Sequence, residues 1–81
     1  MEYQDILSTL TEIHEDDSIP RNIRTRIRDA AEFLEKNQEK TNDLQIDKII
    51  QALDDLGNDP NVPPYTRTQI LGVISNLESA R

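Results

Sequence analysis

The chain has 81 residues, a net charge of −7 at neutral pH and 35% hydrophobic residues, which indicates one small domain with a modest core. The acidic balance argues against general attraction to nucleic acid or to an anionic membrane, although it leaves room for a local basic patch. Cysteine is absent and no apolar run is long enough for a signal peptide or a membrane span, so we expect a cytoplasmic protein without a metal or a cofactor.

Apolar residues recur with helical spacing in four segments, which predicts helices over residues 2–14, 20–37, 43–57 and 64–79. Pro20 and Pro63 lie where helices can begin, because proline is tolerated in the first turn. The polar segment 37–42 is the predicted linker. The apolar stripes predict one core made of Ile6, Leu10, Ile13, Ile23, Ile27, Leu34, Ile49, Ile50, Leu53, Leu56, Ile70, Ile74 and Leu77.

Two helix boundaries carry specific expectations. Asn42, with Gln45 three residues later, resembles a capping box at the start of the third helix. Gly57 follows Leu56 and suits the left-handed residue past the end of that helix. His14, the only histidine, aligns with Gly57 and is expected at the same position at the end of the first helix, rather than as a metal ligand or a general base.

The sequence repeats itself at a shift of 43 residues. Residues 6–35 align with residues 49–78 without a gap, and nine of the thirty pairs are identical. Ile27 aligns with Ile70, and Arg24 aligns with Arg67. We therefore expect one helical domain over residues 1–81 built from two αα-hairpins, each with a proline turn. An all-α, antiparallel four-helix bundle is the preferred fold, and a pair of stacked HEAT-like repeats is the alternative.

Two stretches carry a resemblance to a known family: DDSIPRNIRTR at residues 16–26 and NDPNVPPYTRT at residues 58–68. They resemble the proline-turn motifs of a small archaeal family of uncharacterised proteins, and the resemblance covers nearly the whole chain. It implies an all-α four-helix fold and a cytoplasmic location, and it implies no activity. Members often have histidine before the Thr-Arg pair, where this chain has Tyr65.

The strongest local charge lies at the predicted start of the second helix. At 100° per residue, three arginines share one sector beside the apolar stripe, whereas Arg26 points elsewhere: Arg21, Arg24 and Arg28. These three residues are candidates for binding nucleic acid or another anion. Pairing with the acidic residues 15–17 and with Glu32 is the preferred explanation of these arginines, and an acidic protein partner is a third reading.

The acidic residues of the corners have a simple structural explanation. Asp16 and Asp59 each stand four residues before a proline, where an aspartate serves as a turn or cap residue. No calcium-loop spacing and no catalytic motif accompanies them, so we expect no enzyme. The expected function is that of a non-catalytic interaction module or homo-oligomer, and the alternative is a nucleic-acid-binding accessory protein that uses the arginine face.

The fourth predicted helix has an unusual outer face. Apart from Arg67 and Glu78, the span 65–80 carries no charge, although a solvated helix normally places charged residues opposite its core stripe. We expect a homodimer through five residues of this face, with an unknown protein partner as the other possibility: Thr68, Leu71, Gly72, Ser75 and Ser79. The face could instead be merely polar, or covered by the N-terminal segment around Tyr3.

Overall fold

The computed structural model describes residues 3–37 and 42–79, and these residues form four helices and no strand. The helices are α1 (Tyr3–His14), α2 (Arg21–Lys36), α3 (Asp43–Gly57) and α4 (Pro64–Ser79). The predicted all-α fold is confirmed, and each described helix end lies within one residue of its predicted position. Of the predicted linker 37–42, residues 38–41 lie outside the described residues, as does residue 2 at the predicted start of the first helix.

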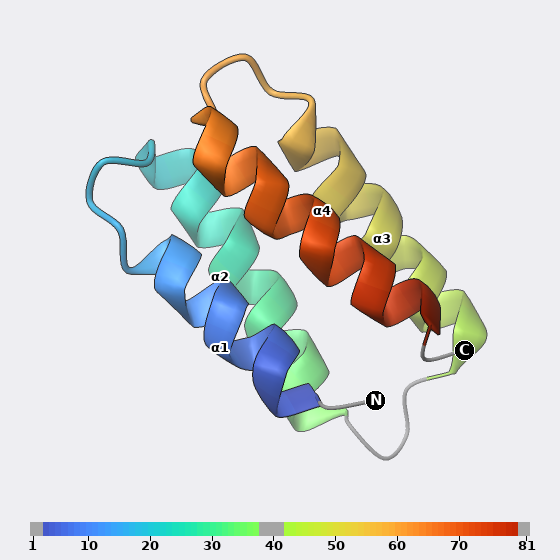
Figure 1. Cartoon of the computed structure of the whole chain (residues 1–81). Coiled ribbons are helices and arrows are strands. Elements are labelled where there is room, and N and C mark those ends of the chain that lie inside the picture. Colours follow the sequence, from blue (N-terminus) through green and yellow to red (C-terminus); the bar gives the residue numbers. More distant parts are fainter. Residues whose placement is uncertain (1–2, 38–41, 80–81) are drawn as a thin grey trace.

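The axes of the four helices run along the length of the bundle, and the two proline turns lie at the same end of it (Figure 1). Among the described helices, α1 packs against α2 and α4, α3 packs against α4, and α2 and α3 approach each other at only a few points. A stack of HEAT-like repeats would pack α1 on α3 and α2 on α4. Neither contact occurs between these helices, so the HEAT-like alternative is wrong and the four-helix bundle holds.

The core follows the predicted apolar stripes with one exception. Ile27 and Ile70, which the repeat aligns, are both fully buried, as predicted. Ile50 was expected in the core but is only partly buried and packs against its edge. Its place on α3 explains this, because Ile50 is rotated by about 100° from Ile49, whose side of the helix faces the interior. Six further apolar residues are buried: Leu7, Ile19, Ala31, Ile46, Val62 and Val73.

The two corners use the same turn chemistry. Asp16 Oδ1 accepts hydrogen bonds from the hydroxyl of Ser18 at 2.7 Å and from its backbone N–H at 2.9 Å. Asp59 Oδ1 accepts one from the N–H of Asn61 at 2.8 Å. The hydroxyl bond, then the backbone bond, holds the pKa of Asp16 below its ordinary value because both stabilise the carboxylate. The turn role expected of both aspartates is therefore confirmed.

The helix ends support one prediction and contradict another. Asn42 and Gln45 form the expected capping box, with Asn42 Oδ1 accepting from Gln45 N–H at 2.9 Å and Gln45 Oε1 accepting from Asn42 N–H at 3.1 Å. The left-handed conformation expected of His14 and Gly57 is wrong, since no described residue has a positive φ and each residue ends its helix. The chain turns instead through Asn58 N–H, which donates to the carbonyls of Asp54 and Asp55.

Candidate functional site

The arginine face lies at the first turns of α2, and only part of it is tied to the corner. Arg24 Nε donates to the carbonyl of Ile19 at 3.0 Å, and its Nη1 lies 3.4 Å from Asp17 Oδ1. Arg28 Nε lies 3.9 Å from Glu32 Oε1, so the expected pairing exists but is weak. The Arg21 side chain makes no ion pair or hydrogen bond to the described residues.

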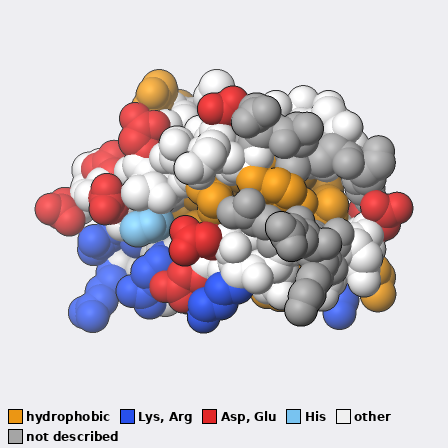
Figure 2. All heavy atoms as spheres, turned by 90° about the horizontal axis from the view of Figure 1, so that it is seen from below, with side chains coloured by type: hydrophobic (Ala, Val, Ile, Leu, Met, Phe, Trp, Pro, Cys, Tyr) orange, Lys and Arg blue, Asp and Glu red, His pale blue; other side chains and the backbone are white. Residues whose placement is uncertain are grey.

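The three arginines converge on a small hollow with two residues that were not assigned to this site from the sequence. His14, at the end of α1, and Thr25 complete the lining of a cavity of about 120 Å³. Figure 2 shows Lys and Arg side chains gathered beside the single histidine, with Asp and Glu side chains nearby. The lining itself contains no carboxylate. The sequence therefore found the arginines but missed the imidazole that the α1 terminus adds to them.

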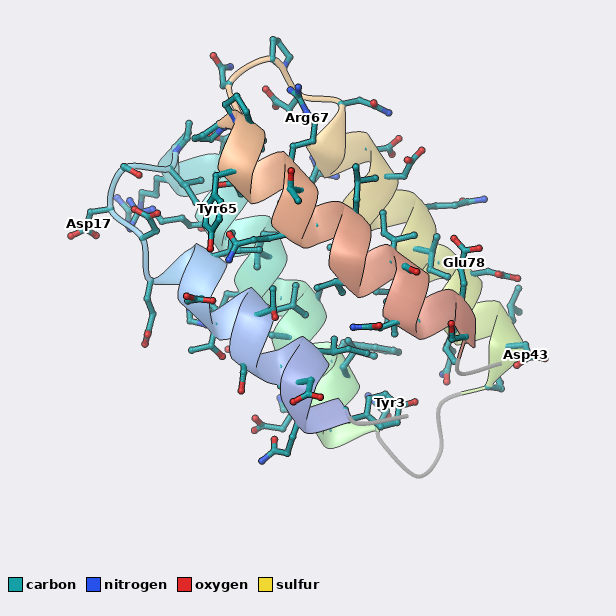
Figure 3. The ribbon with its side chains drawn as sticks, in the orientation of Figure 1. Tyr3, Asp17, Asp43, Tyr65, Arg67 and Glu78 are labelled. Carbon is teal, nitrogen blue, oxygen red and sulfur yellow. The ribbon has the colours of Figure 1, made fainter. Side chains whose placement is uncertain are left out.

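At the second corner, the equivalent arginine is hydrogen-bonded to the backbone of the turn. Arg67 reaches back from α4 into the turn (Figure 3), where its Nε donates to the carbonyl of Gly57 at 2.7 Å. Its Nη2 donates to the carbonyl of Asp59 at 3.3 Å. The last carbonyls of a helix lack intrahelical donors, so Arg67 caps the C-terminal end of α3. Arg24 and Arg67 therefore each donate hydrogen bonds to backbone carbonyls of their own turn, Arg24 to Ile19 and Arg67 to Gly57 and Asp59.

The outer face of α4 is open to solvent, as the homodimer prediction requires. All five of its expected residues are exposed, and Leu71 retains 54% of its accessible surface. A Cβ added to Gly72 would have no neighbour within 4 Å, so within the described chain nothing approaches this glycine closely. The hydroxyl of Thr68 donates to the carbonyl of Pro64 at 3.2 Å. The face is not covered by Tyr3, which packs against the core cluster instead.

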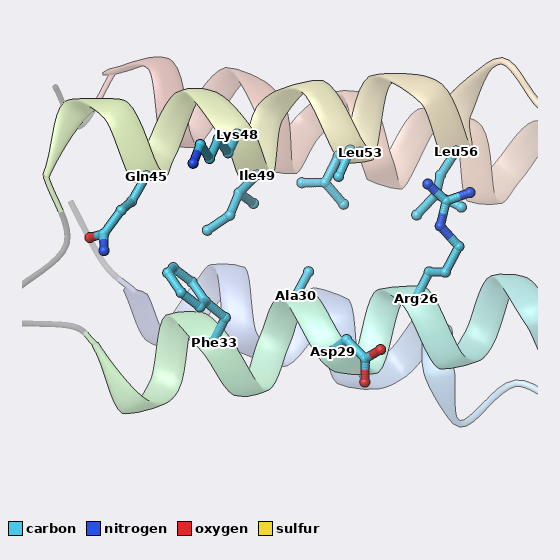
Figure 4. Close-up of a pocket in the computed structure, with 10 residues that line it drawn as sticks. Arg26, Asp29, Ala30, Phe33, Gln45, Lys48, Ile49, Leu53 and Leu56 are labelled. Carbon is cyan, nitrogen blue, oxygen red and sulfur yellow. The ribbon is translucent and has the colours of Figure 1, made fainter.

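A further surface, which the sequence did not reveal, lies between α2 and α3. The two helices diverge around a groove of about 460 Å³ (Figure 4), and apolar side chains from both helices point into it. Phe33 on α2 is 37% exposed at one end, and Arg26 reaches toward Leu56 at the other. The remaining lining residues are Asp29, Ala30, Gln45, Lys48, Ile49, Ala52 and Leu53. One of the four sides of the bundle is therefore incompletely packed.

Neither a metal centre nor a membrane segment is present in the described part of the chain. No group of three or more His, Cys, Asp or Glu side chains in residues 3–37 and 42–79 is arranged to hold a metal ion. None of the helices there combines the length and the apolar content that crossing a bilayer requires. The surfaces that remain as candidate sites are the arginine hollow, the α4 face and the α2–α3 groove.

A family model described as an uncharacterised protein family, UPF0147, matches residues 2–80. The chain belongs to UPF0147. The members compared are archaeal, and the resemblance found in the proline-turn motifs is thereby confirmed. The family is described as uncharacterised, so the match establishes family membership and adds no support for the nucleic-acid alternative.

Individual UPF0147 proteins match over most of their length. A protein of Methanothermobacter thermautotrophicus is 39% identical over 72 residues, which are 89% of this chain and 70% of the relative. The protein MJ1419 of Methanocaldococcus jannaschii is 40% identical over 72 residues, 89% of this chain and 76% of the relative. The crystal structure of the unknown function protein MMP1188 superposes with a TM-score of 0.84 at 43% identity, covering 98% of this chain and 89% of that one.

Proposed function

We propose that this UPF0147 protein is a non-catalytic helical interaction module of the archaeal cytoplasm that works as a homodimer joined across the α2–α3 groove. The observation that carries this proposal is the groove itself. Apolar side chains from both helices line it, and Phe33, which is 37% exposed, lies at one end. Covering this surface removes apolar area from water, which favours association by about 25 cal/mol per Å² before the cost of association is subtracted.

A second copy suits this groove because the α2 side is complementary to itself. Arg26 and Asp29 are three residues apart on α2 and both line the groove. In a two-fold interface the same patch faces itself, so an Arg26 of one copy can pair with an Asp29 of the other, and the reverse pair follows by symmetry. Phe33 can likewise enter the groove of the opposite copy.

Net charge also favours this face over most of the surface. Two chains of charge −7 repel each other, so a dimer must bring together faces with little negative charge. The groove lining contains Arg26 and Lys48 and one carboxylate, that of Asp29.

A standard interface buries roughly 800 Å² on each partner, about 15% of the 5172 Å² exposed by this chain. Added salt screens the overall repulsion and should therefore strengthen the dimer.

The outer face of α4 is the competing dimer interface, and matched substitutions separate the two. Sedimentation equilibrium would compare the wild type with Phe33→Lys, Gly72→Lys and Leu44→Lys, each of which introduces one lysine. Leu44 is 64% exposed and lies outside both surfaces, so its variant controls for added charge alone. Gly72→Lys should fold normally, because open space surrounds the new Cβ.

We expect the wild type to be dimeric at high micromolar concentration and Phe33→Lys to be monomeric, with the other two variants still dimeric. Dissociation by Gly72→Lys alone would transfer the interface to α4. A wild-type monomer under these conditions would refute self-association through either surface. Circular dichroism of each variant would establish that a monomer is a folded monomer.

A further inference from the structure

We propose that the hollow lined by His14, Arg21, Arg24, Thr25 and Arg28 binds one phosphate group of a small phosphorylated ligand. Three arginines and one histidine line a cavity of about 120 Å³ whose lining holds no carboxylate. This concentration of positive charge occurs on a chain with a net charge of −7. The site is separate from the α2–α3 groove, because the two sets of lining residues have no member in common.

The guanidinium groups of this hollow have few protein partners. Each arginine carries five N–H donors. To the described residues, however, the three guanidinium groups together donate two hydrogen bonds: Arg24 Nε to Ile19 O and Arg24 Nη1 to Asp17 Oδ1. The contact of Arg28 with Glu32, at 3.9 Å, is longer than a hydrogen bond. Most of the donors are therefore available to an oxyanion, and arginine donors suit the geometry of phosphate oxygens.

The internal repeat shows which of these residues the corner needs. At the second corner Arg67 closes the turn, and the positions equivalent to His14, Arg21 and Arg28 are occupied by Gly57, Pro64 and Leu71. The second hairpin thus forms the same corner without any of these three basic side chains. Arg24 has a structural role like that of Arg67, whereas the other three basic residues are additional to what the turn requires.

Their placement is also unfavourable unless an anion compensates for it. Cations at the first turn of a helix oppose the helix dipole, and Arg21 and Arg24 lie in the first turn of α2. Neighbouring carboxylates compensate weakly, since the Asp17 side chain that contacts Arg24 is 98% exposed. A phosphate group in the hollow would interact with three guanidinium groups at once, and the hydroxyl of Thr25 adds a further donor.

The size of the hollow distinguishes a single phosphate group from a nucleic-acid strand. A strand needs a basic groove that follows several phosphates, usually with aromatic side chains on which bases stack. The lining here is compact and contains no Phe, Tyr or Trp side chain. The chemistry of recognition is thus that of one phosphate group, supplied by inorganic phosphate, pyrophosphate or a phosphorylated metabolite.

The test is isothermal titration calorimetry of the full chain with inorganic pyrophosphate at low salt. The variants are Arg21→Gln and Arg28→Gln, and the matched control is Lys36→Gln. Lys36 is exposed on the same helix and loses the same charge, but it lines neither the hollow nor the α2–α3 groove. We expect 1:1 binding by the wild type, a loss of roughly tenfold in affinity for each of the two variants, and less than about twofold for the control.

Three results would overturn the proposal. The first is the absence of pyrophosphate binding by the wild type at millimolar concentration. The second is an equal loss in Lys36→Gln, which would reduce the effect to net charge. The third comes from a single-stranded RNA oligonucleotide without terminal phosphates. If the protein retains this RNA and pyrophosphate does not displace it, the basic face follows a strand rather than holding one phosphate.

His14→Gln should weaken pyrophosphate binding without reducing stability, because Gly57 occupies the equivalent position at the second corner.

Discussion

Replacing Arg67 with methionine should destabilise the fold more than the same replacement of Arg24. Methionine keeps an unbranched apolar stem, so the change removes mainly the guanidinium and its hydrogen bonds. Arg67 loses its bond to Gly57 O at 2.7 Å and its longer bond to Asp59 O at 3.3 Å. Arg24 loses one carbonyl bond at 3.0 Å and a contact with a fully solvated carboxylate.

The expected magnitudes follow from these contacts. A hydrogen bond to a charged donor contributes about 1.5–3 kcal/mol, and a long one contributes about 0.5–1 kcal/mol. The contact between Arg24 and Asp17 contributes about 0–1 kcal/mol, because water screens an exposed pair. Partial exposure of the Arg24 side chain, at 29%, reduces its value further. We therefore expect a loss of about 2–4 kcal/mol for Arg67→Met and about 1–3 kcal/mol for Arg24→Met.

Urea denaturation followed by circular dichroism measures both losses, and thermal melts give an independent ranking. For a chain of this length, each kcal/mol corresponds to roughly 4–8 °C in Tm. Equal losses, or a larger loss at Arg24, would contradict the reasoning, because the corner would then depend on something other than these carbonyl bonds. A matching Lys36→Met variant, at an exposed position of α2, controls for the loss of one charge from that helix.

Three further predictions concern stability. Ile27→Ala and Ile70→Ala should each lower the free energy of unfolding by about 2–5 kcal/mol in urea titrations, because both side chains are fully buried; a much smaller loss at either site would show that the repeat does not place them equivalently. Asn42→Ala should cost about 1 kcal/mol in a thermal melt, and Asn42→Gly only a few tenths, because the capping box loses its acceptor. The pKa of Asp16 is lowered in the folded state, so the carboxylate stabilises the fold above the ordinary aspartate pKa and loses this effect as the pH falls through the folded pKa. Asp16→Asn should therefore be less stable than the wild type near neutral pH, and urea titrations at acidic pH should show the difference shrinking.

The helices could be predicted from the sequence because prolines and apolar spacing mark them locally. The repeat aligns the two corners with each other, so the turn role predicted for Asp16 supported the same role for Asp59. His14 and Gly57 were misplaced because glycine after an apolar stripe is a frequent signal for a left-handed terminus, whereas this chain ends the helix through Asn58.

The α2–α3 groove was missed for a different reason. Apolar spacing tells which face of a helix is buried, but it does not tell how closely two helices approach. The sequence does carry one signal, because Phe33 lies next to the buried Leu34 rather than on the same stripe. The same argument, applied to Leu71, did identify the α4 face. The hollow beside His14 needed the end of α1 to be placed against α2, and only the fold provides that.

The pattern of helix contacts also has a consequence for the order of folding. The α1–α2 and α3–α4 contacts join neighbours in the sequence, whereas the α1–α4 contact, which includes a hydrogen bond of 3.3 Å from Gln69 to Glu12, joins distant parts of the chain. Closing a short loop costs less entropy than closing a long one, so each hairpin is a potential nucleus and the α1–α4 contact forms late. Weakening that late contact should accelerate unfolding while leaving the folding rate nearly unchanged. The lifetime of the native bundle can therefore change without a change in its rate of formation.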